Sequence, residues 1–313
     1  MLSRIADSLF WLNRYMERAD GMLRILQTHY NASLDTNQFR NGSWRPMVEI
    51  FSHADEENIA RMENDGSAAL KHLLLDTSNL NSLKVIVTRA RENARGAQDH
   101  ITKEVWEEVN HLYHLINQTS LQQALEDNRA MQIMVALGKQ TLLFAGTTDI
   151  TMPRGQGWCF MNAGKYVERC LETLVMTNKE FAQVNFDLNN MRDITEWRYL
   201  LLCLSGYELH LKTYRTTEYN KNVMHQVLFN EDFTRSLVYS LSRLYRYLEN
   251  MTDVSASEES AALMRSIGRL YNKVRYTEPF SINGESLQSF LRSVKKELLD
   301  CSKQLSQVFF SYA

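Results

Sequence analysis

The chain has 313 residues, of which 44% are hydrophobic and 23% charged, and its formal net charge is -2. That length can bury the cores of two domain-sized units, and the near-neutral charge argues against nucleic acid or an anionic membrane as a partner. With only 3 prolines and 12 glycines in the chain, few residues interrupt a helix, so long helices are expected.

The four cysteines contain no CxxC pair, which predicts buried free thiols in a reducing compartment rather than a zinc site or disulfides. The N-terminal segment carries Arg4, Asp7 and Arg14 before any apolar region forms, unlike an export signal. The longest apolar run, residues 200–204, is far shorter than the roughly 20 residues of a membrane span. We therefore expect a cytoplasmic protein with no membrane segment.

Apolar residues recur at intervals of three, four and seven along residues 5–26, which predicts a first helix from Ser3 to about His29. Residues 31–43 are expected to form a loop, and Pro46 should lie in the first turn of the next helix. Further helices are expected at about 70–75, 85–97, 102–115, 128–144, 195–215, 217–229, 233–252, 258–275 and 285–311. No alternating apolar and polar run predicts a strand, so the expected fold class is all-α.

Several landmarks recur in the same order about 150 residues apart. The repeated pairs are Glu17-Arg18 and Glu168-Arg169, Trp44-Arg45 and Trp197-Arg198, and Ser82-Leu83 and Ser236-Leu237. This pattern predicts an internal duplication: a helical bundle of two tandem related units with pseudo-two-fold symmetry, packed as one compact assembly. The units are expected at residues 1–150 and 151–313, with the glycine-rich stretch 146–157 as the boundary.

The two Glu-Arg pairs belong to charged stretches that we call the first ER segment (Arg14–Arg18) and the second ER segment (Lys165–Arg169). In the first, Arg14 can reach Glu17 at i+3, but Arg14 and Arg18 lie at i,i+4, where like charges repel. The second ER segment repeats this arrangement with the residues Lys165, Glu168 and Arg169. An additional anion between the cations would offset the repulsion, either a carboxylate from another helix or a ligand.

Glu92, in an Arg-rich helix, is the first candidate for the internal carboxylate, with Asp20 and Glu172 as local alternatives. One interpretation is that the ER segments form buried ion pairs that fix the register of the helices. The other is an anion site for a carboxylate or phosphate, which arginine forks bind bidentately. Both interpretations stay open at this point.

Motifs for metal or nucleotide binding are incomplete or absent. Glu108 and His111 form an ExxH, half of a di-iron carboxylate motif, but the sequence has no second ExxH. No GxxxxGK[ST], GxGxxG or GxSxG motif occurs either. The sequence therefore predicts no metal and no cofactor.

The opening run Met1-Leu2-Ser3-Arg4-Ile5-Ala6, continuing through Trp11 into the first ER segment, resembles the signature opening of the Alpha-E family. The resemblance continues through Ala90–Arg95, the helix of Trp106 and Gly157-Trp158 ahead of the second ER segment, and so covers essentially the whole chain. The positions that match the family's motifs are Arg4, Trp11, Arg14, Glu17, Arg18, Arg91, Glu92, Asn93, Arg95, Glu168 and Arg169.

That family comprises bacterial all-helical proteins named for an ER motif. Its members are encoded beside, or fused to, ATP-grasp-like amide ligases, often with transglutaminase-like proteins, and no catalytic residue is established for it. The resemblance therefore implies an accessory protein that binds such a ligase, or its peptide or carboxylate substrate. The alternatives are an enzyme that uses the ER segments on a carboxylated substrate, and a structural bundle with a self-paired ion network.

Overall fold

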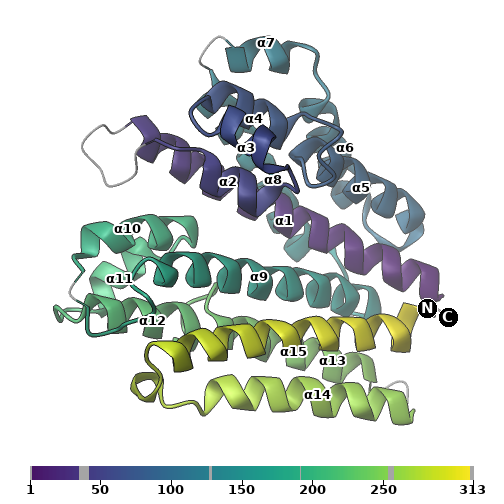
Figure 1. Ribbon diagram of the computed structural model, residues 1–313. Helices are drawn as coiled ribbons and strands as arrows, with labels where there is room; N and C mark the ends of the chain where they lie inside the picture. The colour runs from purple at the N-terminus through teal and green to yellow at the C-terminus, as the bar shows by residue number, and fades with distance from the viewer. Residues whose placement is uncertain (1, 35–41, 127–128, 191, 253–256, 311–313) are drawn as a thin grey trace. The chain divides into compact units, whose positions relative to one another are not determined.

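The computed structural model describes residues 2–34, 42–126, 129–190, 192–252 and 257–310 (Figure 1). The protein is 79% helical, and its described residues form fifteen α-helices and two short 3-10 helices but no strand. The expected all-α fold class is thus confirmed. No helix in this described part combines the length and the apolar character that crossing a bilayer requires.

The chain divides into two compact units. Unit 1 comprises Met1–Phe10 together with Arg154–Ala313, and unit 2 comprises Trp11–Pro153. The first helix, α1 (Ser3–Leu34), therefore begins in unit 1 and continues in unit 2.

An aromatic cluster holds the start of α1 in unit 1. The ring centroid of Phe10 lies 5.3 Å from that of Phe310, and the ring of Phe160 lies 6.1 Å from Phe310 and 5.3 Å from Phe309. Phe10 is fully buried, and burying a phenyl side chain stabilises the folded state by about 2 kcal/mol. This packing explains why residues early in the chain belong to the same unit as its last helix.

Unit 2 is built from α1 and the helices that follow it. These helices are α2 (Arg45–Phe51), α3 (Glu56–Met62), α4 (Gly66–Leu74), α5 (Leu83–Gly96), η1 (Gln98–His100), α6 (Lys103–Ile116), α7 (Ser120–Glu126) and α8 (Ala130–Thr151). Helix α6 packs against both α5 and α8. Two hydrogen bonds join α1 to α8: Gln27 Nε2 donates to the carbonyl of Met134 at 2.8 Å, and the Thr141 hydroxyl donates to Asp20 at 3.1 Å.

Unit 1 is organised around a four-helix bundle. Its helices are α9 (Gln156–Ala182), α10 (Ile194–Cys203), α11 (Tyr207–Thr213), α12 (Tyr219–Phe229), α13 (Leu237–Thr252), α14 (Glu258–Arg275), η2 (Pro279–Ser281) and α15 (Glu285–Phe310). Helices α9, α13, α14 and α15 each pack on the next, and α15 packs back on α9 (Figure 1). Helix α12 packs against α10 and α13 at one end of this bundle.

The single helix expected at 195–215 is in fact two helices, α10 and α11. Between them Ser205 adopts a positive φ of 55°, which ends the regular helix. A Cβ on the following Gly206 would meet Gln226 Nε2 at 2.7 Å and Phe233 Cζ at 2.8 Å. Glycine is therefore required at the break, because any side chain would displace buried neighbours.

The break expected at 146–157 is shorter than the glycine content suggests. Helix α8 continues to Thr151, and residues 152–155 alone separate it from α9. A glycine inside a helix, such as Gly146, destabilises the helix by about 1 kcal/mol relative to alanine. The packing of α8 on α6 outweighs this cost. Pro153 ends the helix, because proline excludes the helical conformation from the residue before it.

Some expectations fall on residues outside those described. Most of the loop expected at 31–43 lies there, and α1 extends to Leu34 rather than ending near His29. Asn128, the expected start of a helix, and residue 311, the expected end of the last helix, also lie outside the described residues.

Candidate binding site

The first ER segment lies in the middle of α1. Arg14 and Glu17 are buried, and Arg18 is half-buried. The Arg14 guanidinium lies 4.5 Å from the centre of the Trp11 ring, and that of Arg18 lies 5.8 Å from the centre of the Tyr15 ring. Each of the three charged side chains has an interaction partner, as the desolvation of a buried charge requires.

The second ER segment lies in the first half of α9. Glu168 and Arg169 are buried, while Lys165 is half-buried. The Lys165 ammonium and the Arg169 guanidinium lie 5.8 Å and 5.3 Å from the centre of the Tyr166 ring. Arg169 Nη1 also donates to the carbonyl of Thr234 at 3.3 Å. Arg169 therefore helps to hold the turn that leads into α13.

The Arg-rich helix α5 uses Arg91 within unit 2. Arg91 Nε donates to Asn110 Oδ1 at 2.6 Å, and its guanidinium lies over the rings of Tyr113 and Trp106, at 4.5 Å and 5.7 Å. The side chain of Glu92 is 56% exposed, and its carboxylate lies 3.7 Å from Arg91 on the same helix. Glu92 is therefore not the internal carboxylate for the first ER segment, and that expectation is wrong because the residue faces solvent.

Asn93, Arg95 and Arg4 are further positions that match the family's motifs. The Asn93 amide donates to the carbonyl of Arg89 at 2.8 Å, one turn earlier on α5. Arg95 and Arg4 are exposed.

The two local carboxylates each lie close to an arginine of their own unit. Asp20 is 3.7 Å from Arg24, four residues later on α1. Glu172 is 3.6 Å from Arg235, which precedes α13. The first pair lies within α1, and the second joins α9 to the turn before α13.

A group of tyrosines beside the second ER segment was not predicted. Tyr166 stacks on Tyr247 of α13 with 6.0 Å between ring centroids, and Tyr239 lies 6.4 Å from Tyr166. Burial raises the pKa of Tyr166, so its hydroxyl stays protonated at neutral pH. The Arg243 guanidinium lies 4.9 Å from the centre of the Tyr239 ring. The four-residue spacing of Tyr239, Arg243 and Tyr247 is the signal in the sequence that marks this group.

The ExxH pair holds no metal-like arrangement. Glu108 accepts a hydrogen bond from Gln140 Nε2 of α8, and His111 is exposed. Among the described residues, no three or more His, Cys, Asp or Glu side chains are grouped so that they could hold a metal ion.

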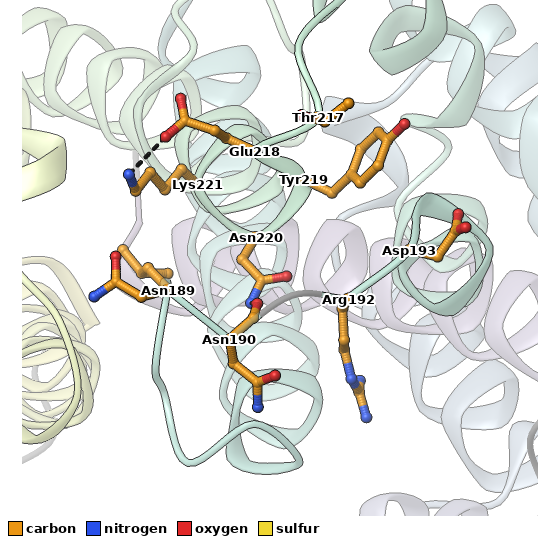
Figure 2. A pocket seen from close by; sticks show the side chains of 10 residues that line it. Asn189, Asn190, Arg192, Asp193, Thr217, Glu218, Tyr219, Asn220 and Lys221 are labelled. Atoms are coloured by element: carbon orange, nitrogen blue, oxygen red, sulfur yellow. Dashed lines mark hydrogen bonds and ion pairs between the residues drawn. The ribbon is translucent and has the colours of Figure 1, made fainter.

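A pocket of about 500 Å³ opens in unit 1, between the loop after α9 and the N-terminus of α12 (Figure 2). Most of its lining residues are polar, and they carry both signs of charge. The lining residues are Leu188, Asn189, Asn190, Arg192, Asp193, Thr217, Glu218, Tyr219, Asn220 and Lys221. This pocket is the candidate binding site of the described residues.

Asn220 fixes the floor of the pocket and is only 2% exposed. Its amide nitrogen donates to the carbonyls of Asp187 at 3.2 Å and Asn190 at 2.5 Å, and its Oδ1 accepts from Trp197 Nε1 at 2.8 Å. Figure 2 shows the lining side chains arranged around this residue. The three bonds tie α12 to α10 and to the loop between α9 and α10, so the pocket is preformed.

The charges around the pocket come from two helix starts. Glu218 precedes α12 but makes no capping hydrogen bond, because its carboxylate accepts from Lys221 Nζ at 2.7 Å (Figure 2). The first amides of α12 therefore lack a side-chain cap and carry the positive end of the helix dipole. Asp193 caps α10, and Arg192 Nε lies 2.7 Å from Glu196.

Comparison with known proteins gives the chain a family. The sequence model of the Alpha-E family, described as a predicted alpha-helical domain with a conserved ER motif, matches residues 1–310. The chain belongs to the Alpha-E family. The ER dipeptide occurs in it as Glu17-Arg18 and Glu168-Arg169. No solved structure matches this Alpha-E chain.

Curated relatives come from mycobacteria. Uncharacterized proteins of Mycobacterium bovis and of two strains of Mycobacterium tuberculosis are each 23% identical to this Alpha-E chain over 321 residues. The matches cover 95% of this chain but 35% of each relative. The chain thus spans about a third of the length of these relatives.

The pocket of this Alpha-E chain is suited to recognition. It offers amides, a tyrosine hydroxyl and charges of both signs, which are the groups that orient a small polar ligand. The sequence analysis missed the pocket, although turn-forming residues are dense in the stretch Asp187–Asp193.

Proposed function

We propose that this Alpha-E chain is a non-catalytic accessory component of an ATP-grasp-type amide or peptide ligase system, and that its pocket holds an amino acid or short peptide substrate of the ligase. The pocket of unit 1 is the observation that supports the proposal. Its volume of about 500 Å³ lies within the range of small-molecule sites. The resemblance to the family supplies the ligase context.

A zwitterion matches the charges of the pocket. The α-carboxylate of a ligand would be attracted to the uncapped amides of α12 and to Lys221, because helix N-termini and ammonium groups both favour anions. The α-ammonium would be attracted to Glu218 or Asp193 across the pocket. Neutral amides such as Asn189, which is exposed, can bond the peptide group of a dipeptide.

We infer that the ER segments serve the scaffold, as in the structural interpretation of the sequence. Burial of Arg14, Glu17, Glu168 and Arg169, together with their interaction partners, supports this role, since buried charges need paired surroundings. An active site built on these residues would need a ligand to displace those partners.

The proposal includes the internal duplication. The serines of the two Ser-Leu pairs each begin a helix: Ser82 accepts from the amide of Val85 at the start of α5, and Ser236 accepts from the amide of Tyr239 at the start of α13. Such repeated N-caps support two related units with pseudo-two-fold symmetry. The four buried free cysteines support a reducing, cytoplasmic setting, which an ATP-dependent partner would share.

Isothermal titration calorimetry with amino acids and dipeptides tests the ligand. Saturable binding is expected, and Lys221→Gln should weaken it at least tenfold. Lys212→Gln is the matched control, because Lys212 is an exposed lysine of the neighbouring helix α11 outside the pocket lining. Absence of binding for every zwitterion, or equal weakening in both variants, would reject the pocket as the site.

The ligase partner is tested separately with an ATP-grasp-like ligase and a transglutaminase-like protein from the same organism. Copurification with the ligase and an increased rate of amide formation are expected. Amide formation by the chain alone, lost in Arg18→Ala and Arg169→Ala while both variants stay folded, would favour the alternative of an enzyme in its own right.

A further inference from the structure

Helices α9 and α13 of unit 1 bring three tyrosines together around one arginine. Tyr239, Arg243 and Tyr247 recur at intervals of four residues on α13, so they lie on one face of that helix. Tyr166 of α9 packs against both of these tyrosines, with ring centroids 6.4 Å and 6.0 Å away. The Arg243 guanidinium lies 4.9 Å from the centre of the Tyr239 ring, and the three tyrosines are its electrostatic neighbours. We call these four residues the Tyr-Arg cluster.

The positive charge of Arg243 is not balanced within the Tyr-Arg cluster. The residue is half-buried, and no carboxylate among the described residues pairs with it. The tyrosines do not supply the negative charge, because burial raises the pKa of Tyr166 and of Tyr247 and keeps both hydroxyls protonated. A guanidinium carries five N–H donors and does not lose its proton. Arg243 therefore retains donors and a charge for an anion from outside the chain.

The hydroxyl of Tyr166 is a second polar group that lacks a partner. Only 8% of this residue is exposed, yet its hydroxyl makes no hydrogen bond within the described part of the chain. A tyrosine hydroxyl at this depth ordinarily has a hydrogen-bond partner. The Lys165 ammonium and the Arg169 guanidinium lie 5.8 Å and 5.3 Å from the centre of the Tyr166 ring. Both have other partners, but their charges add to the attraction of this place for an anion.

We propose that the Tyr-Arg cluster binds a small oxyanion, which is the phosphate group or the carboxylate of a ligand. Arg243 of α13 supplies the charge and a fork of N–H donors, and Tyr166 of α9 supplies a neutral O–H donor from the facing helix. Arginine forks are the donors that best match the paired oxygens of phosphate and carboxylate groups. The inference goes beyond the proposed function and does not depend on it, because none of the four residues lines the pocket.

Isothermal titration calorimetry with sodium phosphate and with sodium acetate tests the site, at an ionic strength held constant with sodium chloride. Saturable binding of at least one of the two anions is expected, and the anion that binds more tightly identifies the ligand group. Arg243→Gln should weaken this binding at least about tenfold, because a hydrogen bond between charged groups is lost. Arg246→Gln is the matched control, since Arg246 is an exposed arginine of the same helix outside the cluster, and it should bind like the unchanged protein.

Tyr166→Phe tests the second donor, because it removes the hydroxyl and keeps the ring. Binding should weaken about tenfold, as expected for one hydrogen bond to an anion. Tyr245→Phe is the control for this change, at a half-buried tyrosine of α13 that stacks on Tyr271 instead. Lys221→Gln separates the cluster from the pocket, whose helix start also favours anions. Binding of phosphate or acetate to the cluster should persist in Lys221→Gln.

Thermal melting separates a binding role of Arg243 from a structural one. A half-buried guanidinium without a counter-charge adds little to the stability of the fold. In chloride alone, Arg243→Gln should therefore keep or raise the melting temperature, while the increase caused by the bound anion disappears. A lower melting temperature in chloride, with the anion-induced increase retained, would show a structural arginine and overturn the proposal. If Arg243→Gln does not fold, Tyr166→Phe decides in its place.

Three results of the titrations would also overturn the proposal. The first is the absence of binding for both anions. The second is equal binding by Arg243→Gln and Arg246→Gln, or by Tyr166→Phe and Tyr245→Phe. The third is the loss of binding in Lys221→Gln, which would place the anion in the pocket.

Discussion

Replacing Asn220 by alanine should destabilise unit 1 by about 3 kcal/mol. The side chain donates to the carbonyls of Asp187 and Asn190 and accepts from the indole of Trp197. Each hydrogen bond contributes about 1 kcal/mol net, and a buried donor left without a partner costs about 1–3 kcal/mol. Trp197 is fully buried, so its indole N–H becomes such a donor. Urea-induced unfolding followed by tryptophan fluorescence and circular dichroism measures the loss.

A matched control lies two residues further along α12. The Asn222 side chain donates to the backbone carbonyl and the hydroxyl of Thr216, so Asn222→Ala should cost no more than about 1 kcal/mol. Trp197→Phe removes the shared bond from the other side, and the double variant with Asn220→Ala should lose less than the sum of the single losses. A loss below about 1 kcal/mol for Asn220→Ala, or strict additivity, would refute the role of this amide.

Three further outcomes are expected. Glu17→Ala should lower the free energy of unfolding by about 3–5 kcal/mol, because it removes a partner from buried charges. Glu92→Ala, at an exposed site, should change the free energy of unfolding by no more than about 0.5 kcal/mol. Equal losses for the two variants in urea unfolding would contradict the scaffold role. Burial raises the pKa of Cys301 to about 11, so alkylation of this thiol in the folded protein should be slow at pH 8 and faster as the pH approaches the pKa. Mass spectrometry measures the alkylation, and rapid labelling of Cys301 at pH 8 would contradict the prediction. Burial lowers the pKa of His210, so the unfolded chain takes up the proton more readily. The free energy of unfolding should therefore fall as the pH drops below about 6.5, and His210→Gln should reduce that fall when unfolding is measured at pH 5 and pH 8.

Elements set by local patterns were predictable from the sequence. Residues 258–275 were expected as a helix and form α14 with those bounds, and Pro46 lies in the first turn of α2. Features that depend on distant neighbours were not predictable. The break at Ser205 is enforced by packing around Gly206, and the pocket floor requires Asn220 to reach a loop some thirty residues earlier in the chain. Periodicity reports which face of a helix is apolar, but it carries no information on which loops meet.

The magnitudes of the competing interactions support a division between scaffold and binding site. A ligand carboxylate that takes Lys221 from Glu218 gives up one exposed ion pair (with 30% and 60% of the two side chains exposed), which is worth at most about 1 kcal/mol. A ligand that takes Arg14 from its partners must open a buried interaction, at a cost of about 3–5 kcal/mol. Under the proposed function, the pocket would exchange its internal pair for a ligand at little cost to the fold. The same exchange in an ER segment would consume a large part of the stability of a domain.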